Sequence, residues 1–409
     1  MHNNTVKEIL SKASAISLIF LLVLASFTII SLSMTEVKSS EDMGFYIKST
    51  ATFLNEGTDI WNLTQEDRSW ALFMNTSWQT VRLISHAHPL ESITTDEDGN
   101  KLAVFQFQSS LPPGESVDDY VVYHVLSKPR SIPNINYVGS GTFAEIPTSL
   151  QTEYCGRYGF WITDDPQIRD TALAIAGGET KVLRVVAKLV SWIWNNIEYK
   201  SHDPILYPNE TLALREGDCD EQAILLGTFC RILGIPSYLQ MGCVFQPGTN
   251  SSSEGGRVHY TQNDIAWHGW TIVYVPPWGW LPVDLTYVFG SGTDPLNAIK
   301  TGAVMLQYTI QSMNISQNDY LASNRAWEEL LENNNFTVYS TDEMSLTGAV
   351  LGDLNGNNAV NIVDLLIVAQ AFGSTPNDTD WNAVADVNKD GNVNILDLNI
   401  VARRFGKTD

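Results

Sequence analysis

The sequence predicts an α+β protein of several domains, and three features of the chain carry that prediction. Short stretches of alternating polar and apolar residues fill the region 41–145, helical periodicity begins near residue 165, and a loop-and-helix unit occurs twice within residues 350–409. A chain of 409 residues, at roughly 100 to 200 residues per domain, holds two to four domains. Hydrophobic residues make up 44% of the sequence, which is enough to bury a core in each domain.

The chain is strongly acidic, with a formal net charge of −22 and a pI of about 4.6. Long-range attraction to nucleic acid is therefore disfavoured, and we expect no nucleic-acid partner. Calcium, a cationic substrate or a basic partner suits this charge better. Acidity also serves to keep an exported protein soluble, so the charge alone does not choose among these roles.

The first forty residues predict a membrane-targeting segment. Residues 13–35 carry no charge, follow Lys7 and Lys12, and precede Glu36. We expect residues 1–40 to be a signal peptide or an N-terminal membrane anchor that leaves the rest of the chain outside the cell. The protein is thus expected to be extracellular, either secreted or anchored to the membrane. Sequons compatible with glycosylation occur at Asn62, Asn75, Asn209, Asn250, Asn314, Asn335 and Asn377.

Residues 41–145 predict an antiparallel β-sandwich that serves as an accessory domain. Its strand candidates are YIKSTATFL, SWALFM, KLAVFQFQ and DYVVYHVL, separated by turns such as DEDGN and LPPGES. Three histidines of this region, His86, His88 and His124, lack the spacing of metal ligands. We therefore expect them to have packing or surface roles.

A helix that begins at Cys219 is the centre of the predicted core. Asp218 is a suitable N-cap, Glu221 completes a capping box, and Gly234 suits a left-handed C-cap. The free amides and the dipole at the start of this helix favour a thiolate, so the sequence predicts a lowered pKa for Cys219. A helix within residues 181–199 should pack behind it. The apolar stripe of that helix consists of Val182, Val185, Val186, Leu189, Ile193 and Ile197.

Two further polar residues fall on a predicted β-hairpin that runs from HGWTIVYV to GWLPVDLT. With Pro276 at the centre of the turn, His268 lies 276 − 268 = 8 residues before it and Asp284 lies 284 − 276 = 8 residues after it. The two would be direct cross-strand neighbours with Cβ atoms about 5 Å apart. Asp284 would then hold one imidazole nitrogen and leave the other for Cys219, which is the geometry of a catalytic triad.

The segments GDCDEQA, GIPS, HGW and VDLT occur in an order that resembles the transglutaminase-like superfamily, whose core has a papain-like fold. The resemblance spans residues 150–300. It implies a thiol acyl-transfer enzyme that acts on a peptide or protein substrate through Cys219, His268 and Asp284, with no cofactor for catalysis. Hydrolysis of the peptidase or amidase type is the favoured reaction. Protein cross-linking, or a non-catalytic role in a polysaccharide-degrading surface complex, is the alternative.

Other residues of this region carry weaker expectations. Trp267 and Trp270 are expected to line a substrate groove, and Gly269 between His268 and Trp270 stands where many superfamily members have alanine. Residues 301–349 are expected to form a helical extension and linker. The remaining cysteines leave two states open, one disulfide or three free thiols, among Cys155, Cys230 and Cys243.

The C-terminal repeat predicts calcium binding. The loop DLNGNNAVNIVD at 353–364 recurs as DVNKDGNVNILD at 386–397, an offset of 386 − 353 = 33, and an apolar helix follows each copy. Oxygen-bearing side chains at loop positions 1, 3, 5 and 12 are the set that calcium requires in an EF-hand-like loop. The predicted ligands are Asp353, Asn355, Asn357 and Asp364 in loop one, and Asp386, Asn388, Asp390 and Asp397 in loop two.

Two such loops, each followed by a helix and each with Asp at position 12, resemble a dockerin, the calcium-folded module that binds cohesins. The resemblance covers 350–407 of a domain at 350–409 and implies a cohesin-like domain of a scaffold or cell-surface protein as partner. Loop one has Asn358 in place of the expected glycine and fewer carboxylates, so we expect it to bind calcium more weakly. Apolar pairs stand at 362–363 and 395–396, where many clostridial dockerins have hydroxyl pairs, which argues against a clostridial type of partner.

Overall fold

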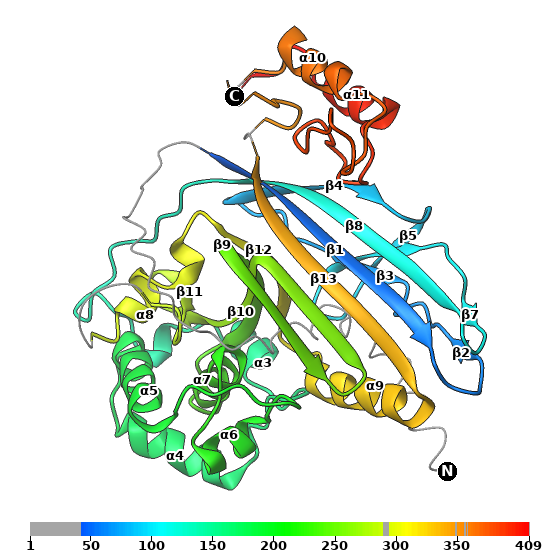
Figure 1. Ribbon diagram of the computed structural model, residues 1–409. Helices are drawn as coiled ribbons and strands as arrows, with labels where there is room; N and C mark the ends of the chain where they lie inside the picture. Colours follow the sequence, from blue (N-terminus) through cyan, green and yellow to red (C-terminus); the bar gives the residue numbers. More distant parts are fainter. Residues whose placement is uncertain (1–41, 289–293, 348–349, 356, 358, 409) are drawn as a thin grey trace.

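The computed structural model describes residues 42–288, 294–347, 350–355, 357 and 359–408, and it has the predicted α+β class. In these residues the main sheet is eight-stranded and curved, with the order β12-β9-β10-β13-β1-β8-β4 and β11 paired to β10 (Figure 1). Its strands are β1 (Met43–Asn55), β4 (Gln79–His86), β8 (Ser116–Ser127), β9 (Ser237–Gly255), β10 (Val258–Val275), β11 (Gly279–Val283), β12 (Thr309–Ile315) and β13 (Phe336–Thr347).

The helices lie against one end of this sheet and at the C-terminus (Figure 1). They are α3 (Thr148–Tyr154), α4 (Pro166–Ala176), α5 (Val182–Asn196), α6 (Pro208–Leu214), α7 (Cys219–Ile232), α8 (Asn297–Lys300), α9 (Tyr320–Asn334), α10 (Ile362–Gln370) and α11 (Ile395–Ala402), with 3-10 turns at Phe143–Glu145 and Ala303–Met305. The predicted targeting segment, residues 1–40, lies outside the described residues. Within the described part of the chain, no helix is long and apolar enough to cross a membrane.

The main sheet joins segments that are far apart in the sequence. β1 pairs with β8 on one side and with β13 on the other, both antiparallel, and β13 then pairs in parallel with β10. The expected helical extension and linker at 301–349 therefore contains two strands of this sheet, β12 and β13. Their pairing partners lie elsewhere in the chain, so local sequence gave no sign of the contact.

A second β layer packs on the N-terminal half of the sheet. It consists of β3 (Ser69–Leu72), β6 (Lys101–Phe105) and β5 (Leu90–Thr95), beside the short pair β2 (Trp61–Asn62) and β7 (Ser110–Leu111). The hydroxyl of Tyr123 donates to the carbonyl of Ala71 at 2.7 Å, and Trp70 Nε1 donates to Asp119 Oδ2 at 2.7 Å. Two packed antiparallel layers are thus present in the region 41–145, but the larger layer continues into the core instead of ending at a domain boundary.

Helix α7 lies at the centre of the core, with β9 and β10 on one side and α5 on the other. Thr271 Oγ1 donates to the carbonyl of Ala223 at 2.7 Å, which ties β10 to the helix. Gly227 of α7 permits Trp161 to pack closely against the helix, because a Cβ there would lie 2.4 Å from the ring of Trp161. All the apolar residues predicted for the stripe of α5 are buried, as expected for a helix that packs behind α7.

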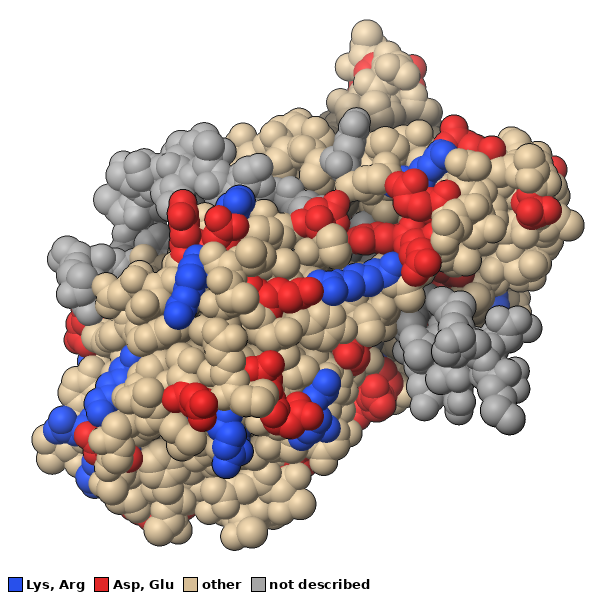
Figure 2. Space-filling model, turned by 90° about the horizontal axis from the view of Figure 1, so that it is seen from below, with Lys and Arg blue, Asp and Glu red and all other residues tan. Residues whose placement is uncertain are grey.

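Charged side chains of both signs are interspersed over the face of the molecule that Figure 2 shows. Acidic residues predominate in the whole sequence, with 46 Asp and Glu against 24 Lys and Arg. The long-range field of the protein is therefore negative, as the composition indicates.

One buried carboxylate connects the N-terminal strands to the strand that carries His268. Asp342 of β13 accepts hydrogen bonds from the Ser49 hydroxyl of β1, from the Tyr260 hydroxyl at 2.7 Å and from Trp267 Nε1 at 2.9 Å, the last two on β10. All four side chains are buried. Burial raises the pKa of Asp342 above its usual value, against the effect of its three donors. The network therefore depends on every donor being present.

We expect Asp342→Ala to lower the free energy of unfolding by about 3 kcal/mol or more, because three buried donors lose their acceptor at once. Urea unfolding followed by near-UV circular dichroism, at constant calcium concentration, measures the loss. Glu343→Ala is the matched control, since its exposed side chain should change stability by only about 0.5 kcal/mol. Equal stability of the two variants would contradict a central role for this network.

Candidate functional site

Helix α7 begins at Cys219, as the sequence predicts. Asp218 is its N-cap, and the backbone N–H of Asp218 donates to Glu221 Oε2 at 2.8 Å, as in a capping box. Gly234 has a φ of 77°, the left-handed conformation expected beyond the end of this helix. The thiol therefore lies at the N-terminal end of a helix with a fixed start and a buried body.

His268 and Asp284 form a buried pair. His268 Nε2 lies 2.9 Å from Asp284 Oδ2, and the two side chains are 1% and 0% exposed. Three backbone N–H groups also donate to the Asp284 carboxylate, those of Thr286 at 3.1 Å, Tyr287 at 3.0 Å and Ala303 at 2.8 Å. The carboxylate is fixed from several sides and can hold the imidazole in one orientation.

The register of the hairpin differs from the expected one. Val275 pairs with Gly279, so the turn is centred one residue later than the sequence suggested. Asp284 follows directly after the last residue of β11, and extension of the register would place it opposite Trp270, not His268. Residues two apart on a strand share a face, so Asp284 reaches the imidazole as a diagonal neighbour.

The remaining imidazole nitrogen, His268 Nδ1, is buried and has no hydrogen-bond partner among the described residues. The rings of Trp270 and Tyr287 lie beside the imidazole, with centroid distances of 5.7 and 5.9 Å. The backbone N–H of Gly269, the next residue along β10, donates to the sulfur of Cys219. The thiol at the start of α7 thus contacts the backbone of β10 at the residue that follows His268.

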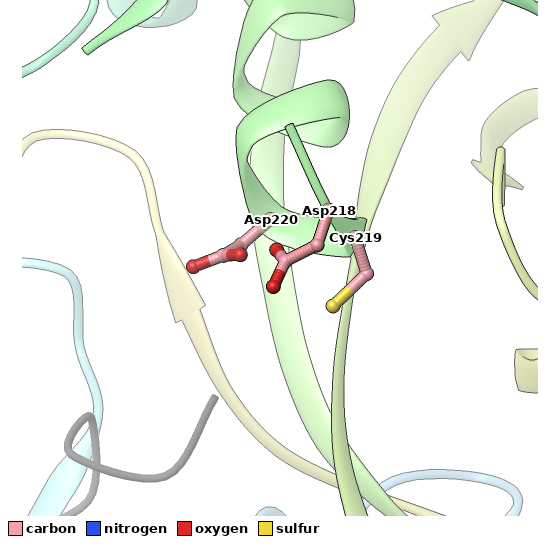
Figure 3. Close-up of side chains that lie close together, drawn as sticks. All are labelled: Asp218, Cys219 and Asp220. Atoms are coloured by element: carbon pink, nitrogen blue, oxygen red, sulfur yellow. The ribbon is translucent and has the colours of Figure 1, made fainter. Parts of the chain in front are cut away.

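Two carboxyl groups flank the thiol. Figure 3 shows the side chains of Asp218, Cys219 and Asp220 close together at the start of α7. Burial, then Asp218 and Asp220, raises the pKa of the Cys219 thiol well above its usual value, although the Gly269 N–H acts in the opposite direction. The predicted lowering of this pKa is therefore wrong for the substrate-free protein, because burial and nearby negative charge outweigh the helix terminus.

The acidic groups also affect one another. Asp218 and Asp220 are hydrogen-bonded to each other, and burial raises the pKa of both carboxyls well above the usual value. Burial and the neighbouring Asp220 raise the pKa of Glu221 to about 7. Asp218, Cys219 and Asp220 have side chains of types that can ligate a metal ion, and among the described residues their ligand atoms form a close group, all within 4.8 Å of one another. Since Cys219 is the candidate nucleophile, we assign this cluster to the thiol site.

Two tyrosines near the thiol were not anticipated from the sequence. The Tyr320 hydroxyl, from α9, donates to Asp220 Oδ2 at 3.1 Å. Tyr199 belongs to a segment in which Glu198 bridges to Glu216, just before the start of α7. Burial and the proximity of Cys219 raise the pKa of Tyr199. Asp220 was visible in the motif GDCDEQ, whereas nothing in the local sequence marks either tyrosine as a neighbour of Cys219.

Trp267 and Trp270 do not line a groove. Trp267 is 4% exposed and donates to Asp342, and Trp270 is 0% exposed and donates from Nε1 to Gln240 Oε1 at 3.1 Å. Both are core residues, and their side chains pack on opposite faces of β10. The expectation of a substrate-binding role was wrong because strand alternation alone does not reveal that both faces of β10 are covered.

The other three cysteines are free thiols in this structure, with Cys230 and Cys243 buried and Cys155 partly buried. Of the two states left open by the sequence, the structure has the reduced one.

The two C-terminal loops have equivalent internal bonds. In loop one, Asp364 Oδ1 accepts from the backbone N–H groups of Leu354 and Asn355, and Asp353 Oδ1 accepts from that of Asn357. Asn355 Oδ1 also accepts from the backbone N–H of Asn357, at 3.1 Å. Three of the predicted ligands of loop one, Asp353, Asn355 and Asp364, thus accept hydrogen bonds from the backbone of the loop itself.

Loop two repeats this pattern. Asp397 Oδ1 accepts from the backbone N–H groups of Val387 and Asn388, and Asp386 Oδ1 accepts from that of Asp390. The oxygen-bearing side chains at these positions are of the kind that calcium prefers, with three carboxylates in loop two against two in loop one.

The two loop-and-helix units fold as one domain. Val360 of loop one bonds with Gly406 and Lys407, which follow α11. Val393 of loop two bonds in the same way with Gly373 and Ser374, which follow α10. Each unit thus completes the other, in agreement with the internal repeat.

Comparisons with known proteins agree with both parts of the chain. A family model described as the transglutaminase-like superfamily matches residues 169–285, and one described as the dockerin type I domain matches residues 351–406. The comparison with curated proteins finds no match.

Three solved structures illustrate the range of similar folds. A candidate cysteine protease from Cytophaga hutchinsonii is 16% identical, with 75% of this chain and 90% of that chain covered and a TM-score of 0.46. Red sea bream transglutaminase is 11% identical, with coverages of 63% and 51% and a TM-score of 0.26. A cohesin–X–dockerin complex from Acetivibrio cellulolyticus is 16% identical, with coverages of 42% and 83% and a TM-score of 0.14.

These TM-scores are low, so the assignment rests on the two family models and on the site and loop motifs described above. The chain therefore contains a transglutaminase-like core at residues 169–285 and a dockerin type I domain at residues 351–406.

Proposed function

We propose that the core is a thiol acyl-transfer enzyme in which Cys219 is the nucleophile, His268 the general base and Asp284 the residue that orients it. The observation that carries this proposal is the buried His268–Asp284 pair at 2.9 Å, with Nδ1 of the same imidazole unpartnered among the described residues. The thiol of Cys219 lies next to the residue that follows His268. A nucleophile, a base and an orienting carboxylate are the parts that such chemistry requires.

The proposed reaction has two stages. His268 Nδ1 takes the thiol proton while Sγ attacks the carbonyl carbon of a peptide or protein amide, and the protonated imidazole then gives its proton to the departing amine. A second acceptor attacks the acyl-enzyme and restores the thiol. Water is the acceptor at the highest concentration, so hydrolysis is the proposed outcome, and an amine acceptor, which gives a cross-link, is the alternative.

The electrostatics favour proton transfer at the moment of attack over a resting thiolate. Cys219 is only 2% exposed, and Asp218 and Asp220 disfavour a negative charge on its sulfur. The resting form of Cys219 is therefore the thiol, which loses its proton only as the sulfur attacks the substrate.

The C-terminal domain is proposed to bind calcium and a cohesin-like domain of a scaffold or cell-surface protein. Its predicted calcium ligands are held in two equivalent loops, and calcium supplies the positive charge that lets the carboxylates converge. Apolar side chains remain exposed at equivalent positions of the two units, where they suit an apolar partner surface. They are Ile362, Val363, Ile395 and Leu396, between 45% and 68% exposed.

We further propose that the protein lies outside the cell, secreted or held at the membrane by its N-terminal segment. Glycosylation at its sequons is part of the same proposal. Attachment to a scaffold would bring the thiol site close to whatever the assembly degrades. A complex that degrades polysaccharide is one such setting.

Substitutions in the triad should separate chemistry from folding. We expect Cys219→Ala to abolish turnover, His268→Ala to reduce it by about 10³-fold, and Asp284→Asn to reduce it less, by about 10²-fold, because Asp284 only orients the base. Incubation with a pool of peptides and primary amines, followed by mass spectrometry, measures the products. Cleavage adds the mass of water, whereas cross-linking removes that of ammonia.

Cys155→Ser is the matched control for this series, because it removes a thiol outside the site and should leave the products unchanged. Products formed at the wild-type rate by Cys219→Ala would contradict the proposed nucleophile.

The reactivity of Cys219 should depend on pH in the manner of a thiol with a raised pKa. In the substrate-free protein, alkylation by iodoacetamide should be slow at pH 7 and should still rise above pH 9.0, the ordinary value for this thiol. Asp220→Asn removes a negative charge beside the sulfur and should speed alkylation at pH 8 by about tenfold, which corresponds to one pKa unit. Peptide mapping by mass spectrometry follows Cys219 alone.

Asp164→Asn provides the control, since that carboxylate is exposed and forms its ion pair with Arg157. A rate that reaches its plateau below pH 8 in the wild-type chain would show that the thiol is already ionised and would contradict this account.

The two calcium loops should differ in strength. Asp390→Ala removes a carboxylate and should weaken calcium binding by about tenfold, whereas Asn357→Ala removes a neutral amide and should weaken it less. Calorimetric titration of the full chain with calcium compares the two variants, and a chelator should leave the chemistry at Cys219 unchanged. Equal losses in both variants would argue against the assigned ligands.

A further inference from the structure

The dockerin domain packs on the outer face of the main sheet, above β1 and β8 (Figure 1). Tyr46 of β1 and Val122 of β8 belong to the same buried apolar cluster as Val360, Val387 and Val393 of the dockerin domain. The contact is therefore a packed interface between the transglutaminase-like core and the C-terminal domain.

Loop two supplies the polar part of this interface. Lys48 of β1 donates from Nζ to the backbone carbonyl of Lys389 at 2.7 Å, and the same ammonium lies 5.4 Å from the ring centroid of Tyr120. Lys389 Nζ lies 5.2 Å from the ring centroid of Tyr46 and donates to the carbonyl of Ala383 at 2.7 Å. One charged hydrogen bond, from Lys48 to Lys389, and one lysine–aromatic contact, between Lys389 and Tyr46, thus hold this loop on the sheet.

Lys389 has a particular place in loop two. It lies between Asn388 and Asp390, two of the predicted calcium ligands, and its φ of 57° is in the left-handed region that few residues with side chains adopt. Lys48 therefore holds the backbone at the point where the loop must bend for its ligands to converge.

Loop one has no equivalent of this contact residue. The position that corresponds to Lys389 is 389 − 33 = 356, which is Gly356 in the sequence. The contact with the core therefore depends on a lysine that loop two has and loop one lacks. The repeated pattern alone does not provide this contact.

We propose that calcium binding to loop two and docking of the dockerin domain on β1 and β8 are coupled. This inference rests on the proposed function of the loops as calcium sites. Without the cation, the carboxylates of Asp386, Asp390 and Asp397 repel one another. This repulsion opposes the bend that places Lys389 against the core. With the cation, the docked and calcium-bound conformations are the same, so each event favours the other by the same factor.

The coupling can be measured with the full chain and calcium alone. Lys48→Ala removes the hydrogen bond from the core without touching either loop, and it should weaken one of the two calcium sites by about three- to tenfold. Calorimetric titration reports the affinities. Small-angle X-ray scattering, with calcium and with a chelator, reports whether the dockerin domain stays on the core, and the maximum dimension should increase on chelation. Lys101→Ala, on the exposed start of β6, is the matched control and should titrate as wild type.

Lys389→Gly provides a second variant, since glycine adopts the left-handed conformation and stands at the equivalent position of loop one. It should keep the loop but lose the contact with Tyr46, with the same loss of affinity as Lys48→Ala. Wild-type affinities in both variants, or a scattering profile that does not change with calcium, would overturn the coupling. Either result would leave the assignment of the calcium sites intact. A wild-type chain that takes up no calcium would overturn both the coupling and the proposed function of the loops.

Discussion

The rest of the structure depends on a buried carboxylate that must be satisfied. Asp342 lies where β13 passes between β1 and β10, and its hydrogen bonds to Ser49, Tyr260 and Trp267 require all three strands to be in register. A buried charge without donors is too costly to keep, so the carboxylate selects one arrangement of the sheet. Trp267 directly precedes His268, and the network therefore fixes the height of the imidazole relative to α7. The N-terminal strands act in this way as part of the framework of the site.

The thiol site balances opposing electrostatic effects. The start of α7 and the Gly269 N–H favour negative charge on Cys219, whereas burial and the carboxyls of Asp218 and Asp220 oppose it. In the substrate-free protein the second group prevails. The thiol must therefore transfer its proton as the sulfur reacts, and the unpartnered Nδ1 of His268 is the available acceptor.

Local features of the sequence were sufficient for much of this structure. The capping box predicted the start of α7 at Cys219, the two hairpin arms predicted the His268–Asp284 pair, and the repeat predicted two equivalent loops. The predicted turn centre was wrong by one residue, and the cross-strand pairing therefore by two, because the turn contains two adjacent prolines and its centre had to be assumed. The pairing of β1 with β13 and the burial of Trp267 and Cys219 arise from tertiary contacts with distant segments, which one sequence does not encode locally. That burial, together with the adjacent Asp218 and Asp220, raises the pKa of Cys219.

The pairing of the first strand with one of the last has a consequence for how the chain is made. Gly44 pairs with Thr347, which is 347 − 44 = 303 residues later. Since synthesis proceeds from the N-terminus, the edge of β1 that will accept β13 remains unpaired while nearly the whole core emerges. The sheet cannot close until residues 336–347 have appeared, and the dockerin domain follows directly after them. The core is therefore completed at almost the same time as the dockerin domain is made, so a ribosome that stops early releases a chain that lacks both.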